Sequence, residues 1–283
     1  MNGKKKYDKK YNTLKYDKLY NDYVDELIKL NPDWNLYLQL PKYKYLQKYY
    51  TNISKDDIKK QKQFYKKNEK LLEKRMSSND YKKYPDKIKL YDKILKYEID
   101  TSLENFNYDI YLLPLDQMDN IIISYMIDTS GKDSGLYKFN TLSDYKDYMH
   151  RTKQFSKFCN QCIINMNEGI SKNIVLPKRI TKILINDLNS SIKNKIYINN
   201  KVPNSIKKEW NTTIQNYLVK PVNDIIIFLE NDYLSKSRET IGLYDLPNGN
   251  KMYEFSIRVN TTLDSKSLTP ETIHKLGHSE VKR

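Results

Sequence analysis

The sequence predicts a mainly α-helical protein, a multi-helix array with a short irregular or β segment near residues 108–135. Apolar residues recur three and four positions apart along most of the 283 residues, which is the spacing of a helix with one buried face. Serine, threonine and proline stand before many of these periodic stretches, where they favour helix starts. No tandem repeat and no long Gly/Ser linker divides the chain.

The basic, Tyr- and Lys-rich residues 1–30 are expected to form one or two helices that end at the stretch NPDWN. Ser54, followed by Asp56 and Asp57, predicts the start of a helix that continues to about Met76. Pro85 predicts the start of the next helix. The apolar faces comprise Tyr7, Tyr11, Leu14, Val24, Leu27 and Ile28, then Ile58, Tyr65 and Leu72, then Ile88, Tyr91, Leu95, Ile99 and Phe106.

The helical rhythm is lost between Tyr108 and Gly135. This stretch contains Pro114 and a continuous apolar run over Ile121–Ile123, with no period of three and four. We therefore expect an irregular segment that includes one short strand and packs on the helices.

Helical spacing returns in the second half of the chain. The sequence TLSD at Thr141–Asp144 resembles a capping box and predicts a helix to about Lys153, followed by a separate helix that carries both cysteines. Pro177 and Pro203 predict two further helix starts, and the second of these helices contains Trp210.

The last third of the chain is expected to end in a well-capped helix. Pro221 predicts a kink or a restart in the helix of Trp210, and residues 247–249 predict a turn. Thr269 is placed to cap the last helix, with Pro270 as its first residue and Glu271 complementing the helix dipole.

The two cysteines form a C-x-x-C motif, which occurs in redox pairs and in zinc sites. Their neighbours favour a different interpretation, because Cys159 and Cys162 fall on the apolar stripe of a helix with Phe155, Phe158 and Met166. On such a stripe, cysteine acts as a small apolar core residue. We expect both thiols to be buried.

The formal net charge of +15 allows two explanations. A basic surface can bind nucleic acid, and residues 1–20 carry seven lysines against two aspartates, interleaved with tyrosines that can stack on bases. The abundance of Lys, Asn, Ile and Tyr with only 7 glycines also fits the codon bias of an AT-rich gene. An amphipathic helix with packed tyrosines and solvated lysines would explain residues 1–20 equally.

Membrane and secretory features are not found in the sequence. No stretch reaches the roughly 20 apolar residues of a membrane helix, and no apolar segment follows the charged start MNGKKKYDKKY. We expect a soluble cytoplasmic protein, with association with a virus particle left open.

Several blocks of sequence indicate a family. These are LPLDQMD, NMNEGISKNIVLPK, GLYDLPNG and LTPETIHKLG, in this order. From about Asn31 to the last residue, the chain resembles the domain-of-unknown-function family eight-eight-five, a bacterial-type group regarded as helical zinc metallopeptidases of the gluzincin kind. The resemblance implies a metal motif, a His-Glu pair followed by Pro-Gly-His-His, downstream of these blocks. Because this chain holds no His-Glu pair, we expect residues 31–283 to be the N-terminal part of such a protein, truncated before the metal motif.

The histidines at positions 274 and 278 need separate consideration. Two histidines one helical turn apart can bind zinc, but a thermolysin-like helix also needs a glutamate beside the first one. Lys275 stands there instead, and Gly277 loosens the turn. The resemblance implies that His274 matches a recurring residue that is not a zinc ligand, and that His278 replaces an aliphatic residue. We assign no catalytic, cofactor-binding or metal-binding residue, and we expect no cofactor.

Two functions remain open. In the first, the chain is the non-catalytic half of a metallopeptidase-like protein, inactive alone, which binds peptides or pairs with a second polypeptide or a second copy. In the second, it is a basic structural or nucleic-acid-associated protein, for example in a virus particle. An independent hydrolase has little support, because the acidic pair Asp116 and Asp119 is of a common surface type and no Gly-x-Ser-x-Gly motif is present.

Overall fold

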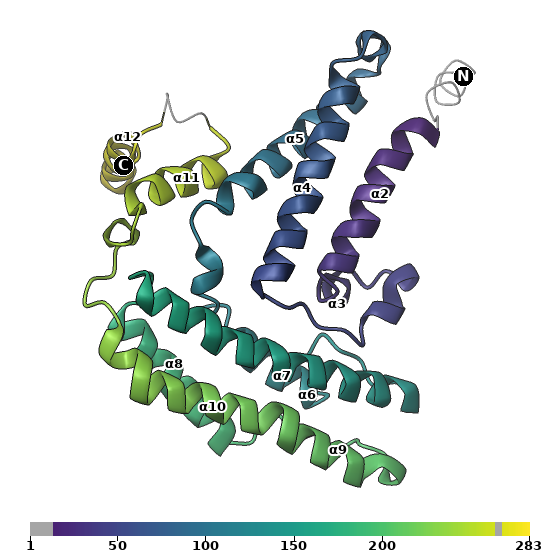
Figure 1. The fold of residues 1–283 in the computed structure, drawn as a ribbon, viewed down its shortest axis with the longest axis vertical. Helices are drawn as coiled ribbons and strands as arrows, with labels where there is room; N and C mark the ends of the chain where they lie inside the picture. The colour runs from purple at the N-terminus through teal and green to yellow at the C-terminus, as the bar shows by residue number, and fades with distance from the viewer. Residues whose placement is uncertain (1–13, 264–267) are drawn as a thin grey trace.

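The computed structural model describes residues 14–263 and 268–283 (Figure 1). Helices make up most of these residues, and they include no strand, only an isolated bridge between Pro177 and Arg238. The prediction of a mainly α fold is therefore confirmed. Tyr7, Tyr11 and the other residues of 1–13 lie outside the described residues, and the rest of the basic stretch forms a single helix that ends at Leu30.

The helices follow one another closely along the chain. The α-helices are α2 (Leu14–Leu30), α3 (Trp34–Leu38), α4 (Lys55–Met76), α5 (Asp86–Asn105), α6 (Ile121–Thr129), α7 (Leu142–Ser171), α8 (Lys178–Lys193), α9 (Lys207–Ile214), α10 (Lys220–Phe228), α11 (Gly249–Thr261) and α12 (Pro270–Lys282). The 3-10 helices are η1 (Pro41–Leu46), η2 (Asn79–Lys83), η3 (Ile110–Leu112), η4 (Asn204–Ile206), η7 (Leu234–Lys236) and η8 (Leu243–Asp245), and the π-helices are η5 (Gln215–Val219) and η6 (Leu229–Tyr233).

Helices α2, α4 and α5 lie side by side and enclose a small core of their own (Figure 1). Its buried residues are Tyr23, Leu27, Phe64, Leu72, Leu95 and Ile99. Within this group Arg75 of α4 pairs with Asp92 of α5 at 3.2 Å, and Tyr20 of α2 donates a hydrogen bond to the same carboxylate at 2.7 Å. This polar link joins all three helices at one level.

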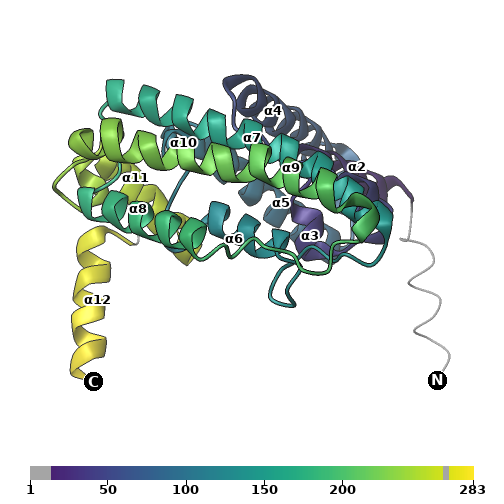
Figure 2. The same ribbon diagram turned by 90° about the horizontal axis from the view of Figure 1, so that it is seen from below.

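Helix α7 is the axis of the second, larger core. It packs against α9, η5 and α10 on one side, and α8 lies against α6 and α10 (Figure 2). Aromatic rings fill much of the space: Tyr125 of α6 stacks on Phe155 of α7 with 3.8 Å between ring centroids, and Trp210 of α9 stacks on Tyr148 at 5.8 Å. Such pairs add to the free energy gained by apolar burial.

The predicted helix starts are found where the capping residues stand. The hydroxyl of Ser54 accepts a hydrogen bond from the N–H of Asp57. Thr141 and Asp144 form a full capping box at the start of α7. Thr269 caps α12, and Pro270 is the first residue of that helix. In each case a side-chain oxygen satisfies an N–H group that the helix itself leaves without a partner.

The prediction of a short strand within residues 108–135 is wrong. Ile121–Ile123 is the first turn of α6, and Asn120 caps it by accepting hydrogen bonds from the N–H groups of Ile122 and Ile123 at 3.2 Å each. The buried residues Ile122, Tyr125 and Met126 do have helical spacing. The apolar run hid this spacing because Ile121, Ile123 and Ile127 are apolar too, although they are not buried.

The predicted break near Lys153 is also wrong, since α7 continues without interruption through both predicted helices. Arg151 and Thr152 are the polar residues at this point of the helix. Both are buried in the structure, where they bond to neighbouring groups, so the core-facing stripe of α7 is continuous.

Pro221 neither ends nor separates its helix. The helical rod continues from α9 through η5 into α10, and the wide π turn of η5 lies directly before Pro221. Proline lacks an N–H donor and crowds the carbonyl four residues earlier. A π turn inserts one extra residue and relieves that conflict, which explains why the rod continues.

The C-terminal helices pack less closely. α11 is attached to the end of α5, where the hydroxyl of Tyr97 donates to the carbonyl of Arg258 at 3.0 Å and Arg258 pairs with Glu104. α12 stands away from the other helices and contains no buried residue (Figure 2). No helix in the described ranges is long and apolar enough to cross a bilayer.

Both cysteines are fully buried in α7, as predicted, and burial raises the pKa of each thiol. We therefore expect the native protein to resist a thiol reagent such as dithionitrobenzoate at pH 8, with labelling no faster than unfolding. Reaction of both thiols in urea is the positive control. Rapid labelling of the native protein would contradict the burial of this face of α7.

Candidate functional site

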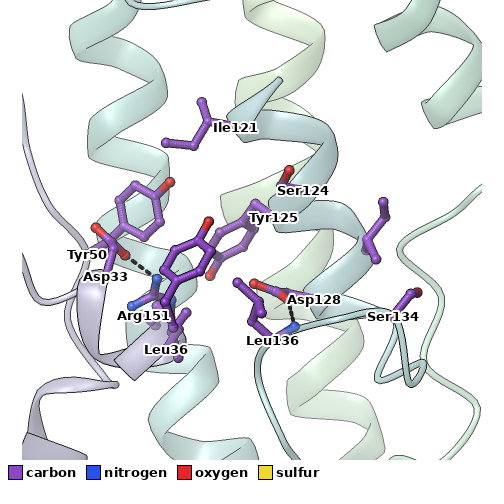
Figure 3. Close-up of a pocket in the computed structure, with 12 residues that line it drawn as sticks. Asp33, Leu36, Tyr50, Ile121, Ser124, Tyr125, Asp128, Ser134, Leu136 and Arg151 are labelled. Carbon is purple, nitrogen blue, oxygen red and sulfur yellow. Dashed lines mark hydrogen bonds and ion pairs between the residues drawn. The ribbon is translucent and has the colours of Figure 1, made fainter. Parts of the chain in front are cut away.

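A cavity of about 230 Å³ opens to solvent between α3, α6 and α7 (Figure 3). We call it the α6 pocket. Its polar lining consists of Asp33, Ser124, Asp128, Ser134 and Arg151, and its aromatic lining of Tyr37, Tyr50 and Tyr125. Leucine and isoleucine side chains complete the walls. A small pocket with apolar walls and a few polar groups is the usual form of a ligand site.

The base of the α6 pocket is built on Arg151, whose side chain is 2% exposed. Its guanidinium pairs with Asp33 and donates to the carbonyls of Gln47 and Tyr49. It also lies over the ring of Tyr50, 4.8 Å from the centroid. These bonds tie α7 to the chain on either side of η1, because a buried charge must find its partners within the protein.

One wall of the pocket is the face of α6 that carries Ser124 and Asp128, one turn apart. Oδ1 of Asp128 accepts hydrogen bonds from the N–H groups of Leu136 and Tyr137, at 2.5 and 3.3 Å, which hold the loop after α6 in place. Burial raises the pKa of the Asp128 carboxyl, against the opposing effect of these two bonds and of the charge on Arg151.

The opposite wall is Tyr50, which Figure 3 shows across the cavity from Ser124 and Asp128. Its ring packs edge-on against Phe155 and Phe158, with centroids 5.1 and 5.3 Å away. The ring is therefore fixed. Among the described residues, neither its hydroxyl nor that of Ser124 has a hydrogen-bond partner, so both are open to a ligand.

The histidines considered in the sequence lie outside the pocket. His150 is exposed on α7, with its ring edge-on to Tyr49 at 5.6 Å. His274 and His278 are exposed on α12, with 3.0 Å between their Nε2 atoms. Across the part of the chain that the structure describes, no group of three or more His, Cys, Asp or Glu residues is arranged to hold a metal ion.

The acidic pair of the sequence also lies elsewhere. Asp116 accepts hydrogen bonds from the N–H groups of Met118 and Asp119, at 2.8 and 2.7 Å, and so shapes a turn before α6. Sequence reasoning missed Arg151, although a signal was present. It stands three residues after Tyr148 and four before Phe155, on the stripe that the pattern of α7 marks as buried.

We expect Arg151→Met to lower the free energy of unfolding by about 3–5 kcal/mol, because it leaves Asp33 and two carbonyls without their buried partner. Urea denaturation monitored by circular dichroism measures the change. Lys157→Met, at an exposed position of the same helix, is the control and should change stability by less than about 0.5 kcal/mol. Equal effects of the two substitutions would contradict the role of Arg151.

Asp128 predicts a pH dependence of stability. Because its folded pKa lies above the ordinary value, the native state binds a proton more tightly than the unfolded state. The contribution of this group to stability therefore falls as pH rises from about 4 through the folded pKa. Asp128→Asn keeps an oxygen for Leu136 and Tyr137 and should remove this part of the pH profile.

The measurement is the midpoint of urea unfolding from pH 4 to pH 8, for the wild type and Asp128→Asn. The urea midpoint of Asp128→Asn, relative to that of the wild type at the same pH, should increase as pH rises. Asp133→Asn, an exposed carboxylate in the neighbouring loop, serves as the control with an unchanged profile. A constant difference across the range would contradict the raised pKa.

Comparison with curated proteins gives no match. The sequence profile of a family described as bacterial protein of unknown function, DUF885, matches residues 32–283. The match spans most of the chain and includes α3 to α12, hence every element that lines the α6 pocket. The chain thus belongs to the DUF885 family.

Proposed function

We propose that this chain is a non-catalytic, metallopeptidase-like member of its family that binds a peptide rather than cleaving it. The α6 pocket carries the proposal, since it offers free polar groups and apolar walls on a base held by the buried Arg151–Asp33 pair. A site that must bind with selectivity needs such a rigid support. At about 230 Å³, the pocket is of the size of one side chain of a peptide.

The positions of the histidines support the non-catalytic part of the proposal. A zinc peptidase holds its metal with three protein ligands and uses a carboxylate to activate water. His274 and His278 are followed by lysine and serine on an exposed helix, and His150 lies on a different helix, beside Tyr49. In this arrangement no carboxylate occupies the position of the base.

The proposal also assigns a partner to α12. This helix has a proper cap, yet none of its side chains is buried, and Leu276 and Val281 are 55% and 87% exposed. Helices of about 13 residues are marginal alone in water. Since the resemblance implies a metal motif on another stretch of polypeptide, we propose that a polypeptide with that motif covers this face.

A second candidate function rests on the outer ridge of α4. Lys59, Lys66, Lys70 and Lys74 are exposed there and form no ion pair among the described residues, while Lys67 pairs with Glu26 of α2 at 2.6 Å. Four lysines along one ridge suit a polyanion such as nucleic acid. Absence of DNA and RNA binding at low salt, where charge-driven binding is strongest, would exclude this candidate.

The proposed function predicts binding without cleavage. The purified chain, incubated with a fluorescent pool of random hexapeptides, should bind part of the pool and leave its mass spectrum unchanged, with or without phenanthroline. Ser124→Trp places a large ring in the mouth of the pocket and should weaken binding at least about tenfold. Ser190→Trp, on the exposed side of α8, should have no effect.

Two outcomes would count against the proposal. Cleavage that phenanthroline suppresses would show a metal-dependent peptidase in this chain. Equal peptide affinity of Ser124→Trp and the wild type would place peptide binding elsewhere. Isolation of the native protein with one zinc per copy, together with a second polypeptide, would identify the partner of α12 and make this chain half of an enzyme.

A further inference from the structure

The polar groups that a ligand can reach in the α6 pocket include one carboxylate and two hydroxyls, all of which can accept a hydrogen bond. Oδ2 of Asp128 has no hydrogen-bond partner among the described residues, and the hydroxyls of Ser124 and Tyr50 are equally free. The guanidinium of Arg151 already donates to the carbonyls of Gln47 and Tyr49 and to Asp33, and its Nε is sealed from solvent. Its charge is therefore balanced within the protein by the carboxylate of Asp33.

The charges of the pocket lead to the same conclusion. Asp33 is fully engaged, since one oxygen pairs with Arg151 and the other accepts from the N–H of Thr51 at 2.8 Å. Lys138, in the loop beside Asp128, donates to the carbonyls of Asp133 and Gly135 rather than to a carboxylate. When ionised, Asp128 is therefore the charge in the pocket that lacks a direct partner, and it would attract a cation.

The aromatic walls suit the same ligand. The guanidinium of Arg151 already lies over the rings of Tyr50 and Tyr125, at 4.8 and 5.9 Å, so Tyr37 is the aromatic ring of the lining over which no cation of the described residues lies. This ring is 70% exposed and leaves its surface open to a ligand. Leu36 and Ile121 provide apolar surface for the stem of such a ligand.

We infer that the α6 pocket binds a primary ammonium group on an apolar stem, the chemistry of a lysine side chain or an alkylamine. An ammonium group has three donors. They match three acceptors: the carboxylate of Asp128 and the hydroxyls of Ser124 and Tyr50. The inference names the ligand group of the proposed peptide site, yet the amine site stands on the pocket alone and can be tested without a peptide.

The first experiment compares three probes of one length: pentylammonium, pentanol and pentanoate. Ligand-observed NMR with the full chain at pH 7.5 gives the affinity of each. Pentylammonium should bind at least tenfold more tightly than the other two. Equal binding of pentanol, or preferred binding of pentanoate, overturns the inference, because apolar contact or an anion site would then explain the pocket.

The second experiment assigns the site. Asp128→Asn retains the oxygen that Leu136 and Tyr137 bind, and it should reduce the affinity for pentylammonium at least tenfold while that for pentanol stays the same. Asp133→Asn, the matched loop variant, should leave both unchanged. If Asp128→Asn does not fold, Ser124→Ala replaces it, because this side chain is exposed and its hydroxyl bonds to no described residue. An unchanged affinity in the folded variant contradicts the inference.

The source of the amine is resolved by two further probes. Nα-acetyl-lysinamide carries only a side-chain ammonium, whereas glycyl-leucinamide carries only a terminal one. Because the pocket has the volume of one side chain, the lysine derivative should bind at least fivefold more tightly. Tighter binding of glycyl-leucinamide overturns the side-chain form. Amine binding without peptide binding would refute the proposed function and leave this inference intact.

Discussion

The buried guanidinium of Arg151 is the interaction on which the arrangement of the two cores depends. The small core of α2, α4 and α5 and the large core around α7 are separate apolar clusters, joined along the chain by the segment from α3 to the start of α4 and by residues 106–120. Arg151 reaches from α7 into this segment and bonds to Asp33, Gln47 and Tyr49. The aromatic rings around it exclude water, which strengthens each of these bonds.

This constraint also shapes the α6 pocket. Tyr50 is fixed between the guanidinium and the phenylalanines of α7, and Asp33 is fixed by its bonds to Arg151 and Thr51. The opposite wall is held independently, because Asp128 ties α6 to the loop that follows it. Each wall of the cavity is therefore held in place by the hydrogen bonds of a charged side chain. The pocket is preformed, so a ligand can bind without ordering its walls.

Local signals in the sequence predict most helices, but not the site. Ser54, Thr141, Thr269 and the prolines mark helix starts because capping is a matter of a few neighbouring residues. Asp33, Asp128 and Arg151 come from three distant stretches, and only folding brings them together. The apolar run of α6 misled for another reason, since apolar residues at positions that are not buried mask the helical spacing of those that are.

The π turn of η5 determines where the long helix that contains it can gain or lose a residue. A π turn is equivalent to the insertion of one residue into an α-helix. An extra residue in a regular α-helix would rotate everything beyond it by about 100°. The π turn accommodates its extra residue locally, and Val222 and Ile225 remain fully buried beyond it. Removal of one residue there, for example the exposed Asn216, would restore α-helical geometry and leave the same face buried. Sequences that share this fold can therefore gain or lose a residue within this turn more readily than within the regular helix α8.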